Sequence, residues 1–284
     1  MRALTILLLL LTLAVPAGAG ELYGPRRIAD GVFALLARPG TEATANALLV
    51  AGDHGAVIVG EHFTARSIEG LFQATAEVTD QPVRQMVLVH HHRGYTHVDF
   101  DFPPGIEVIT GWQSWQALAS EARQVDFPVF FFREGLTLRL GGRTLVLSNL
   151  GPAHTNGDLV AFIPETKTLY CGDLFYPASV GYLAEGFMQE WVLALEFLQS
   201  LEANRVVAGT GPVSDGRALA EFTTFFRAFL TEVIRHLEAG HSLRQTLNDF
   251  RMAEWRHRQD YDRYMAANIE HAYNQLKNSI SPKK

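Results

Sequence analysis

Histidines and an aspartate that follow predicted strands are the residues of this sequence most able to do chemistry. The apolar run 87–89 ends directly on His90, His91 and His92. Residues two apart on a strand project the same way, so His90 and His92 can converge on one cation while His91 points elsewhere. Neutral imidazole is the commonest metal ligand in proteins. The segment therefore predicts a metal site, with a solvated basic loop as the alternative.

Two further segments supply what a complete site needs. One histidine lies in the turn-rich stretch 151–158, between two predicted strands, and one aspartate follows the predicted strand 168–171. Three histidines and a carboxylate can hold a zinc ion and leave a position open for water, which is how a catalytic zinc site is built. The predicted metal ligands are His90, His92, His154 and Asp173.

Composition excludes several other classes of protein. The chain of 284 residues has 24 Lys+Arg against 30 Asp+Glu and no basic block, so we expect no nucleic-acid partner. Cys171 is the only cysteine, which excludes a disulfide framework and any CxxC metal or redox module. Hydrophobic residues make up 48% of the chain, enough to bury a full core. A bound metal must therefore depend on histidine and carboxylate ligands.

The first twenty residues have the layout of a secretory signal. Arg2 precedes an apolar run over 6–15, and Pro16 and small residues at 17–19 follow it. We expect cleavage after Ala19 and export, most simply to a bacterial periplasm. An uncleaved anchor is the less favoured alternative, because the run is shorter than the roughly 20 residues that span a bilayer. We expect no integral membrane protein after cleavage.

Apolar periodicity predicts the elements that must position the site. Short runs separated by Gly or Asp predict strands between residues 27 and 89. Apolar residues three and four apart predict an amphipathic helix over 65–79. Together these patterns indicate sheets covered by helices. Further predicted elements are a strand near 108–109, a helix over 112–123, a hairpin of 136–140 with 143–147, and strands at 159–163 and 168–171.

The last third of the chain changes character. From 218 to 276 the pattern is helical, with breaks at Gly240 and near Asn248. We interpret its regularly spaced aromatic residues as packing positions, and we also assign the aromatic run 127–132 to the core. The expected organisation is a signal at 1–19, a domain over 20–215 and a C-terminal helical extension over 216–284 packed on that domain.

Taken in order, these motifs resemble those of the metallo-β-lactamase fold. They are the His-x-His after a strand, Pro-Ala-His-Thr at 152–155, Gly-Asp-Leu-Phe at 172–175 and Val-Val-Ala-Gly-Thr-Gly-Pro at 206–212. The resemblance implies an α/β (α+β) four-layer αββα sandwich, here with extra C-terminal helices and a metal site at the edge of the sandwich. It also implies that His90, His92 and His154 hold a first metal and that Asp173 is a bridging carboxylate.

The departures from that family's pattern fall on one metal. Its His-x-His-x-Asp-His motif has Gly94 and Tyr95 at the last two positions, and its late Gly-His-Gly-Pro has Thr210 in place of the histidine. We therefore expect a mononuclear centre. Tyr95 could donate a hydrogen bond to a developing oxyanion, or simply fill the vacated volume. The early Asp-Thr-Gly turn reads Gly60-Glu61-His62, and the residues that could rebuild a second site are His62, His97, Asp99 and Asp101.

The leading hypothesis is an exported single-zinc hydrolase that attacks an ester, amide, lactam or thioester of a small molecule with metal-activated water. Asp173 would act as ligand or proton acceptor. The fold does not select the substrate. A second hypothesis uses His90, His154 and Asp173 as a two-histidine, one-carboxylate iron site, similar to that of persulfide dioxygenases in the same superfamily. The third is a non-catalytic periplasmic binding or assembly protein with a remnant metal site.

Overall fold

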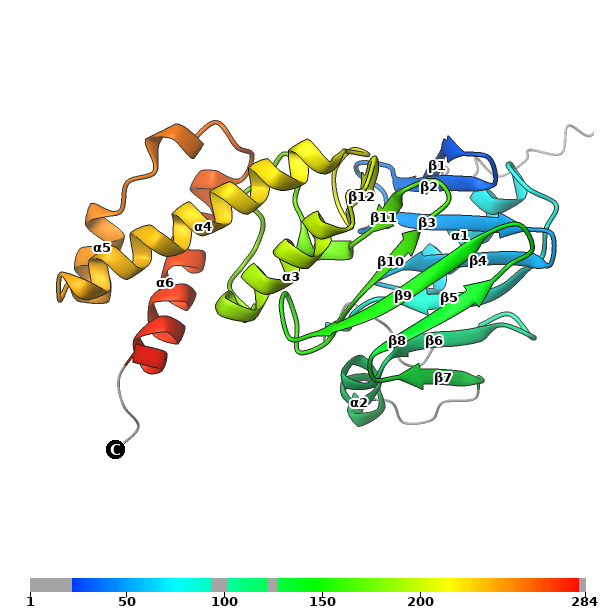
Figure 1. Cartoon of the computed structure of the whole chain (residues 1–284), viewed down its shortest axis with the longest axis horizontal. Helices are drawn as coiled ribbons and strands as arrows, with labels where there is room; N and C mark the ends of the chain where they lie inside the picture. The colour runs from blue at the N-terminus through cyan, green and yellow to red at the C-terminus, as the bar shows by residue number, and fades with distance from the viewer. Residues whose placement is uncertain (1–21, 93–101, 122–126, 281–284) are drawn as a thin grey trace, which may run out of the picture.

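The structure, a computed structural model, describes residues 22–92, 102–121 and 127–280, which form two β-sheets covered by helices (Figure 1). In chain order the elements are β1 (Tyr23–Ala29), β2 (Val32–Ala37), β3 (Ala47–Gly52), β4 (Gly55–Gly60), α1 (Ala65–Ala76), β5 (Val83–Leu88), β6 (Glu107–Gly111), α2 (Trp112–Glu121), β7 (Val129–Phe132), β8 (Gly135–Arg139), β9 (Thr144–Gly151), β10 (Asp158–Ile163), β11 (Thr168–Tyr170), the 3₁₀ helix η1 (Gly172–Leu174), α3 (Met188–Ser200), β12 (Arg205–Val207), α4 (Gly216–Glu238), α5 (Leu243–Asp249), the 3₁₀ helix η2 (Ala253–Trp255) and α6 (Tyr261–Ile280).

The two sheets have different strand orders. The larger sheet runs β1-β2-β3-β4-β5-β6-β7, antiparallel as far as β4 and parallel from β4 to β7. The smaller runs β12-β11-β10-β9-β8, antiparallel except for the parallel pair β11 and β12. The predicted hairpin is β8 and β9, in which Arg139 pairs with Thr144.

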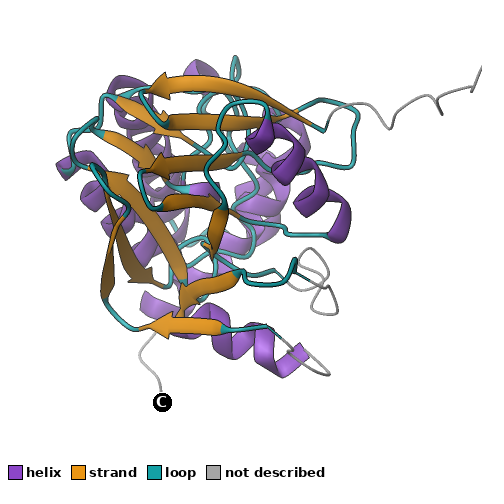
Figure 2. Cartoon of the chain, turned by 90° about the vertical axis from the view of Figure 1, so that its right-hand side faces the viewer, coloured by secondary structure: helices purple, strands orange, loops and turns teal. Residues whose placement is uncertain are grey.

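Three layers of apolar contact hold these elements together. Val59, Val87 and Leu147 lie in the core between the two sheets. The outer face of the larger sheet packs on α1 and α2, and that of the smaller on α3, α4 and α6. Figure 1 shows α3 to α6 gathered on one side of the sheets, and Figure 2 shows most of the helices behind the strands. The layers confirm the expected four-layer αββα sandwich with additional C-terminal helices.

The predicted elements differ from the observed ones in two informative places. Helix α3 is absent from the sequence prediction, although Trp191, Leu195 and Leu198 are buried at helical spacing. The assignment of the run 127–132 to the core is wrong for Phe130 and Phe131, which are 46% and 42% exposed. The cause is topology, because β7 is the edge strand of the larger sheet.

The helices of the C-terminal third adjoin the rest of the chain through one apolar cluster. α4 begins at Gly216, and the break after it comes at Gly240, whose φ is 72°. Side chains of α4 and α6 share their cluster with β10, β11 and η1. No helix among the described residues is long and apolar enough to cross a bilayer. The expected signal at 1–19 lies outside the described residues.

Arg258 joins the C-terminal helices to the loop after η1. Its guanidinium donates to the carbonyl oxygens of Tyr176 at 2.8 Å and Ser179 at 3.0 Å, and it pairs with Glu221 at 3.0 Å. The residue is only 4% exposed. A buried guanidinium that satisfies several backbone acceptors fixes the path of the chain on both sides.

We expect Arg258→Ala to lower the free energy of unfolding by roughly 2–4 kcal/mol, because it strips a donor from several buried carbonyls. Arg256→Ala is the matched control. The Arg256 side chain is 64% exposed, pairs with the exposed Asp262 and lies over the Tyr261 ring, so this change should cost no more than about 1 kcal/mol. Urea unfolding of both variants measures the difference, and equal destabilisation would contradict the anchoring role of Arg258.

Candidate metal centre

The candidate site lies where neighbouring parallel strands end. β4 and β5 are parallel, and the chain leaves them toward Glu61 and toward His90. Asp173 lies in η1, directly after β11, and His154 lies in the loop between β9 and β10. Strand ends from both sheets thus bring residues far apart in the sequence to one edge of the sandwich.

The three predicted imidazoles converge. The ring centroid of His90 lies 5.1 Å from that of His92 and 5.1 Å from that of His154. The centroids of His92 and His154 are 4.8 Å apart. Nε2 of His92 is 2.8 Å from Nε2 of His154, and Nε2 of His154 is 3.8 Å from Oδ2 of Asp173. The structure therefore brings together all four residues predicted as ligands.

His91 points away from this cluster, as the alternation along an extended segment requires. Its Nε2 lies 3.2 Å from Oε1 of Glu121, at the end of α2. The middle histidine of the triplet thus contacts the helical layer, while its two neighbours face the site.

Two glutamates orient the imidazoles. Oε2 of the fully buried Glu61 lies 3.1 Å from Nδ1 of His90, and Oε2 of Glu185 lies 3.2 Å from Nδ1 of His92. A carboxylate beside Nδ1 favours the tautomer with its proton on that nitrogen, which leaves Nε2 as the lone-pair donor. This is the arrangement that supports metal-bound histidine in known sites.

Gly209 leaves the space that Glu61 needs. A Cβ at this position would lie 1.8 Å from Oε1 of Glu61 and 2.6 Å from Oδ1 of Asp173. Any larger residue would displace one of the two carboxyl groups. The first glycine of the late Gly-Thr-Gly-Pro motif is thus required for Glu61 and Asp173 to lie side by side.

The loop that carries His154 is held by its own side chains. The carboxylate of Asp158 accepts hydrogen bonds from the backbone N–H and the hydroxyl of Thr155, both at 2.9 Å. The His154 ring packs at an angle on Trp191 of α3, with centroids 5.1 Å apart. Local polar bonds and one aromatic contact therefore set the position of this imidazole.

Burial keeps the imidazoles neutral. Together with the charge of neighbouring imidazoles, a smaller effect, it lowers the pKa of His92 to about 4 and that of His62 to about 3. The pKa of His154 falls well below its usual value for the same reasons. Near neutral pH these rings therefore offer lone pairs to a cation instead of carrying protons.

The two buried carboxyl groups have the opposite tendency. Burial raises the pKa of Glu61 to about 8, with a smaller contribution from the charge of Asp158, while hydrogen bonding to Asp173 lowers it. The pKa of Asp173 is raised well above its usual value, first by burial and then by Glu61. Without a cation, this pair favours holding a proton between its oxygens.

The described residues fit a metal ion. Nε2 of His90 and Nδ1 of His154 are buried and have no hydrogen-bond partner within the described parts of the chain. If His92 carries its proton on Nδ1, toward Glu185, its Nε2 can only accept a hydrogen bond, and Nε2 of His154 must donate it. Nδ1 of His154 then carries a buried lone pair that no hydrogen bond satisfies. A cation that accepts the facing lone pairs removes this conflict, and His90, His92 and His154 offer it three nitrogens within 4.8 Å of one another.

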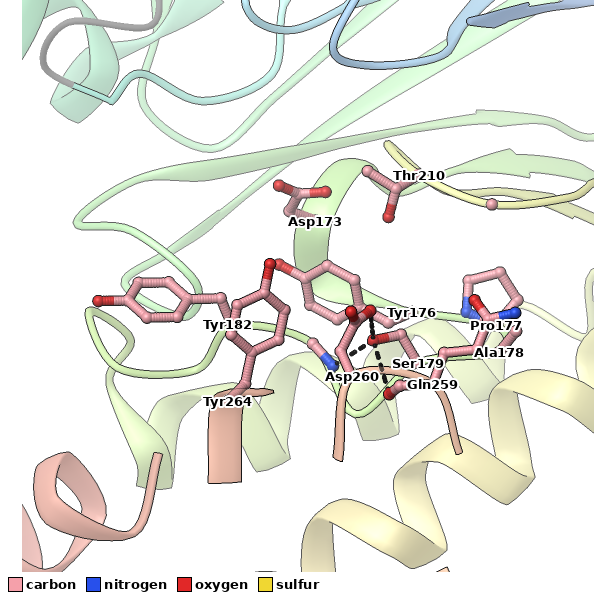
Figure 3. Close-up of a pocket in the computed structure, with 12 residues that line it drawn as sticks. Asp173, Tyr176, Pro177, Ala178, Ser179, Tyr182, Thr210, Gln259, Asp260 and Tyr264 are labelled. Atoms are coloured by element: carbon pink, nitrogen blue, oxygen red, sulfur yellow. Dashed lines mark hydrogen bonds between the residues drawn. The ribbon is translucent and has the colours of Figure 1, made fainter. Parts of the chain in front are cut away.

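A cavity of about 370 Å³ opens over the cluster, lined by His92, His154 and Asp173 on one side and by Arg263 and Tyr264 of α6 on another. An adjoining cavity runs from Asp173 and Thr210 to the start of α6. Figure 3 shows Tyr264 pointing its phenol toward the side on which Asp173 lies. The C-terminal helices thus form part of the wall beside the candidate metal ligands.

Several predicted participants cannot be placed. Tyr95, with Gly94, His97, Asp99 and Asp101, lies outside the described residues. Thr210 lies beside Asp173 in the cavity wall and brings no imidazole. Of the possible second-site ligands, only His62 falls within the described residues, and it lies at the cluster.

The sequence interpretation missed the supporting residues. Glu61 carried a usable signal, because a carboxylate directly after a fully apolar strand is expected to be buried with a partner. Glu185, Arg263 and Tyr264 come from a loop and from a helix assigned to packing, and no local pattern marks them as neighbours of the site.

Comparison with known proteins gives partial matches at the sequence level. The sequence profile of the Metallo-beta-lactamase superfamily matches residues 44–210. The hydroxyacylglutathione hydrolase of Synechococcus sp. (strain JA-3-3Ab) is 27% identical over 151 residues, which cover 47% of this chain and 57% of that protein. The hydroxyacylglutathione hydrolase of Legionella pneumophila (strain Corby) is 24% identical over 134 residues, 46% of this chain and 49% of that protein. The chain spans about half the length of these curated relatives.

Solved structures match over a larger share of the chain. A metallo-beta-lactamase from Pontibacter korlensis superposes with a TM-score of 0.62 at 23% identity, covering 72% of this chain and 99% of that one. The metallo-beta-lactamase FIM-1 from Pseudomonas aeruginosa, in its mono-zinc form, gives 0.61 at 19% identity, with 72% and 95% covered. Because the profile covers more than half of this sequence and the structures share its fold, the chain belongs to the metallo-beta-lactamase superfamily.

Proposed function

We propose that this protein is an exported metal-dependent hydrolase that holds one metal ion tightly, most simply zinc, with His90, His92 and His154. The observation that carries the proposal is the convergence of three imidazoles, two of them with Nε2 atoms 2.8 Å apart, beside the carboxyl group of Asp173. Its substrate is a small molecule with an ester, amide, lactam or thioester bond.

The chain's own groups divide the work of such a reaction. A divalent ion, when bound, lowers the pKa of coordinated water and polarises a carbonyl group. Asp173 is the group placed to accept a proton, because its carboxyl borders both the imidazole cluster and the cavity. Glu61 and Glu185 hold the tautomers of His90 and His92, so that both rings present Nε2 to the ion.

The cavity wall indicates how a substrate is held. Tyr182 and Tyr264 pack edge to face with ring centroids 5.6 Å apart, and both line the two cavities beside Asp173. Such rings offer apolar contact with a hydroxyl group at one end. We propose that they orient the acyl or leaving group, while Arg263, whose side chain is 71% exposed, faces the polar end of the substrate.

The comparisons support hydrolysis and a metal in general terms. The curated relatives are named hydroxyacylglutathione hydrolases, and one structural neighbour is described in a mono-zinc form. The layout of residues 2–19 supports export, and a mature chain that begins at Gly20 is the expected product.

Elemental analysis of the mature protein, purified without added metal, should find about one zinc per chain. The double variant His90→Ala, His154→Ala should lose it, because two of three imidazole ligands are removed. His54→Ala is the matched control, since His54 is exposed in the turn between β3 and β4 and should leave the metal content unchanged.

Asp173→Ala should abolish turnover of ester or lactam substrates that the wild type hydrolyses.

Three outcomes would overturn parts of this proposal. Iron in place of zinc, with oxygen uptake and no hydrolysis, would support the two-histidine, one-carboxylate reading instead. No metal, and none taken up on reconstitution, would leave the non-catalytic binding or assembly protein. Zinc retained in the double variant would place the metal elsewhere in the chain.

Glu61→Gln tests two roles of this carboxyl group, one in the stability of the metal-free protein and one in metal binding. Because burial raises the pKa of Glu61 from 4.5 to about 8, its contribution to stability is full below about pH 4.5 and is lost as the pH rises toward 8. The unfolding free energy of metal-free wild type, relative to Glu61→Gln, should therefore fall by a few kcal/mol from pH 5 to pH 8, at about 1.4 kcal/mol per pKa unit. Chemical denaturation across this range measures it.

The same variant should also weaken zinc binding by roughly 10- to 100-fold, because glutamine is a poorer partner for Nδ1 of a metal-bound His90. Glu77→Gln, at an exposed position just after α1, is the control for both measurements. A stability difference that does not change with pH, together with unchanged zinc affinity, would show that Glu61 acts by packing alone.

A further inference from the structure

A fourth imidazole lies at the metal centre. The ring centroid of His62 is 5.6 Å from that of His90 and 6.2 Å from that of His92. One ring nitrogen of His62, one of His90 and a carboxylate oxygen of Asp173 lie within 4.8 Å of one another. His62 is 9% exposed, so it is part of the enclosed cluster and not of the outer surface.

The local structure holds His62 in an unusual conformation. Its φ is 53°, in the left-handed region that residues other than glycine rarely adopt. The turn is fixed by the capping box of α1, in which Thr64 and Ser67 bond each other, and by the Ser67 hydroxyl, which donates to the carbonyl of His62 at 3.3 Å. A histidine kept at a position suited to glycine, with its ring in a cluster of ligands, indicates a function for that ring.

The nitrogens available limit where each histidine can serve. Nδ1 of His90 faces Glu61, which leaves Nε2 of His90 to bind an ion. In the proposed function this nitrogen serves the position shared with His92 and His154. Of the second group of possible ligands, which is His62, His90 and Asp173, the first and last then remain for another ion. Thr44 Oγ1, 3.4 Å from Nδ1 of His62, favours Nε2 of this ring as the ligand atom.

We propose that His62 and Asp173 form a second cation position, which takes a divalent first-row ion such as Zn²⁺ or Co²⁺ next to the position held by the three histidines. It differs from the one that the family pattern implies, because Gly94, Tyr95 and Thr210 stand where that pattern has its ligands. With two protein ligands and the rest water, it binds more weakly than the first. The proposal rests on the proposed metal centre being real.

Zinc titration of the metal-free protein tests the number of positions. The wild type should saturate near two zinc ions per chain, one tight and one at least tenfold weaker. His62→Asn should lose the weak ion and keep the tight one, and asparagine tolerates a positive φ, so the fold should keep its stability. His54→Asn is the matched control and should bind as the wild type does.

A ligand exchange gives a spectroscopic signature that a structural role cannot produce. Cobalt-loaded His62→Cys should show a thiolate-to-cobalt charge-transfer band that appears only with the second equivalent of Co²⁺. The wild type should lack this band, because its single cysteine, Cys171, is buried with its Sγ toward the carbonyl of Val207.

The outcomes separate this proposal from the proposed function. Saturation of the wild type at one zinc, with His62→Asn unchanged, overturns the second position and leaves the hydrolase proposal standing. Loss of the tight ion in His62→Asn also overturns it, because His62 would then belong to the first position. His92→Ala should weaken only the tight ion, and if it does not, the three-histidine assignment itself fails.

Discussion

The need to neutralise a buried cluster of ionisable groups controls the rest of this structure. His90, His92 and His154 present lone pairs to one another at short range, and Glu61 and Asp173 are buried beside them. Removing such groups from water is costly unless each finds a partner. Without a cation the cluster relieves this cost by keeping His92 and His154 neutral and a proton on the carboxyl pair. A bound cation satisfies both sets of groups at once, so the arrangement is best understood as one that a metal stabilises.

The fold meets this need by fixing the ligands from several directions. Parallel strands bring Glu61 and His90 to one sheet edge, and β11 and η1 bring Asp173 from the other sheet. The segment after Asp173 is then held by Arg258, which belongs to the C-terminal third of the chain. The added helices are therefore part of what positions the centre, and they also supply Tyr264 to the cavity beside it. Buried Asn268 of α6 adds to this link, since it bonds the backbone of Gly181 and Leu183.

The sequence could indicate the candidate ligands because their signals are local. Strand periodicity separates His90 and His92 from His91, and the structure places His91 against Glu121 on the opposite side. Glycine and breaks in periodicity located the C-terminal helices. Tertiary arrangement decided what the sequence could not show. Whether Phe130 and Phe131 are buried depends on β7 being an edge strand, and the approach of Glu185 and Arg263 to the site depends on how separate elements pack.

The departures from the family pattern make physical sense as a set. The early turn carries Glu61 in place of the neutral threonine of the family pattern, and this side chain meets both His90 and Asp173. This contact is possible only because Gly209 has no side chain, since a Cβ there would overlap Glu61. The next residue of the same turn, His62, brings an imidazole to the cluster from β4, whereas the family pattern would bring one from the position of Thr210. An imidazole from this strand end, in place of one at Thr210, keeps nitrogen and carboxylate donors together around the centre.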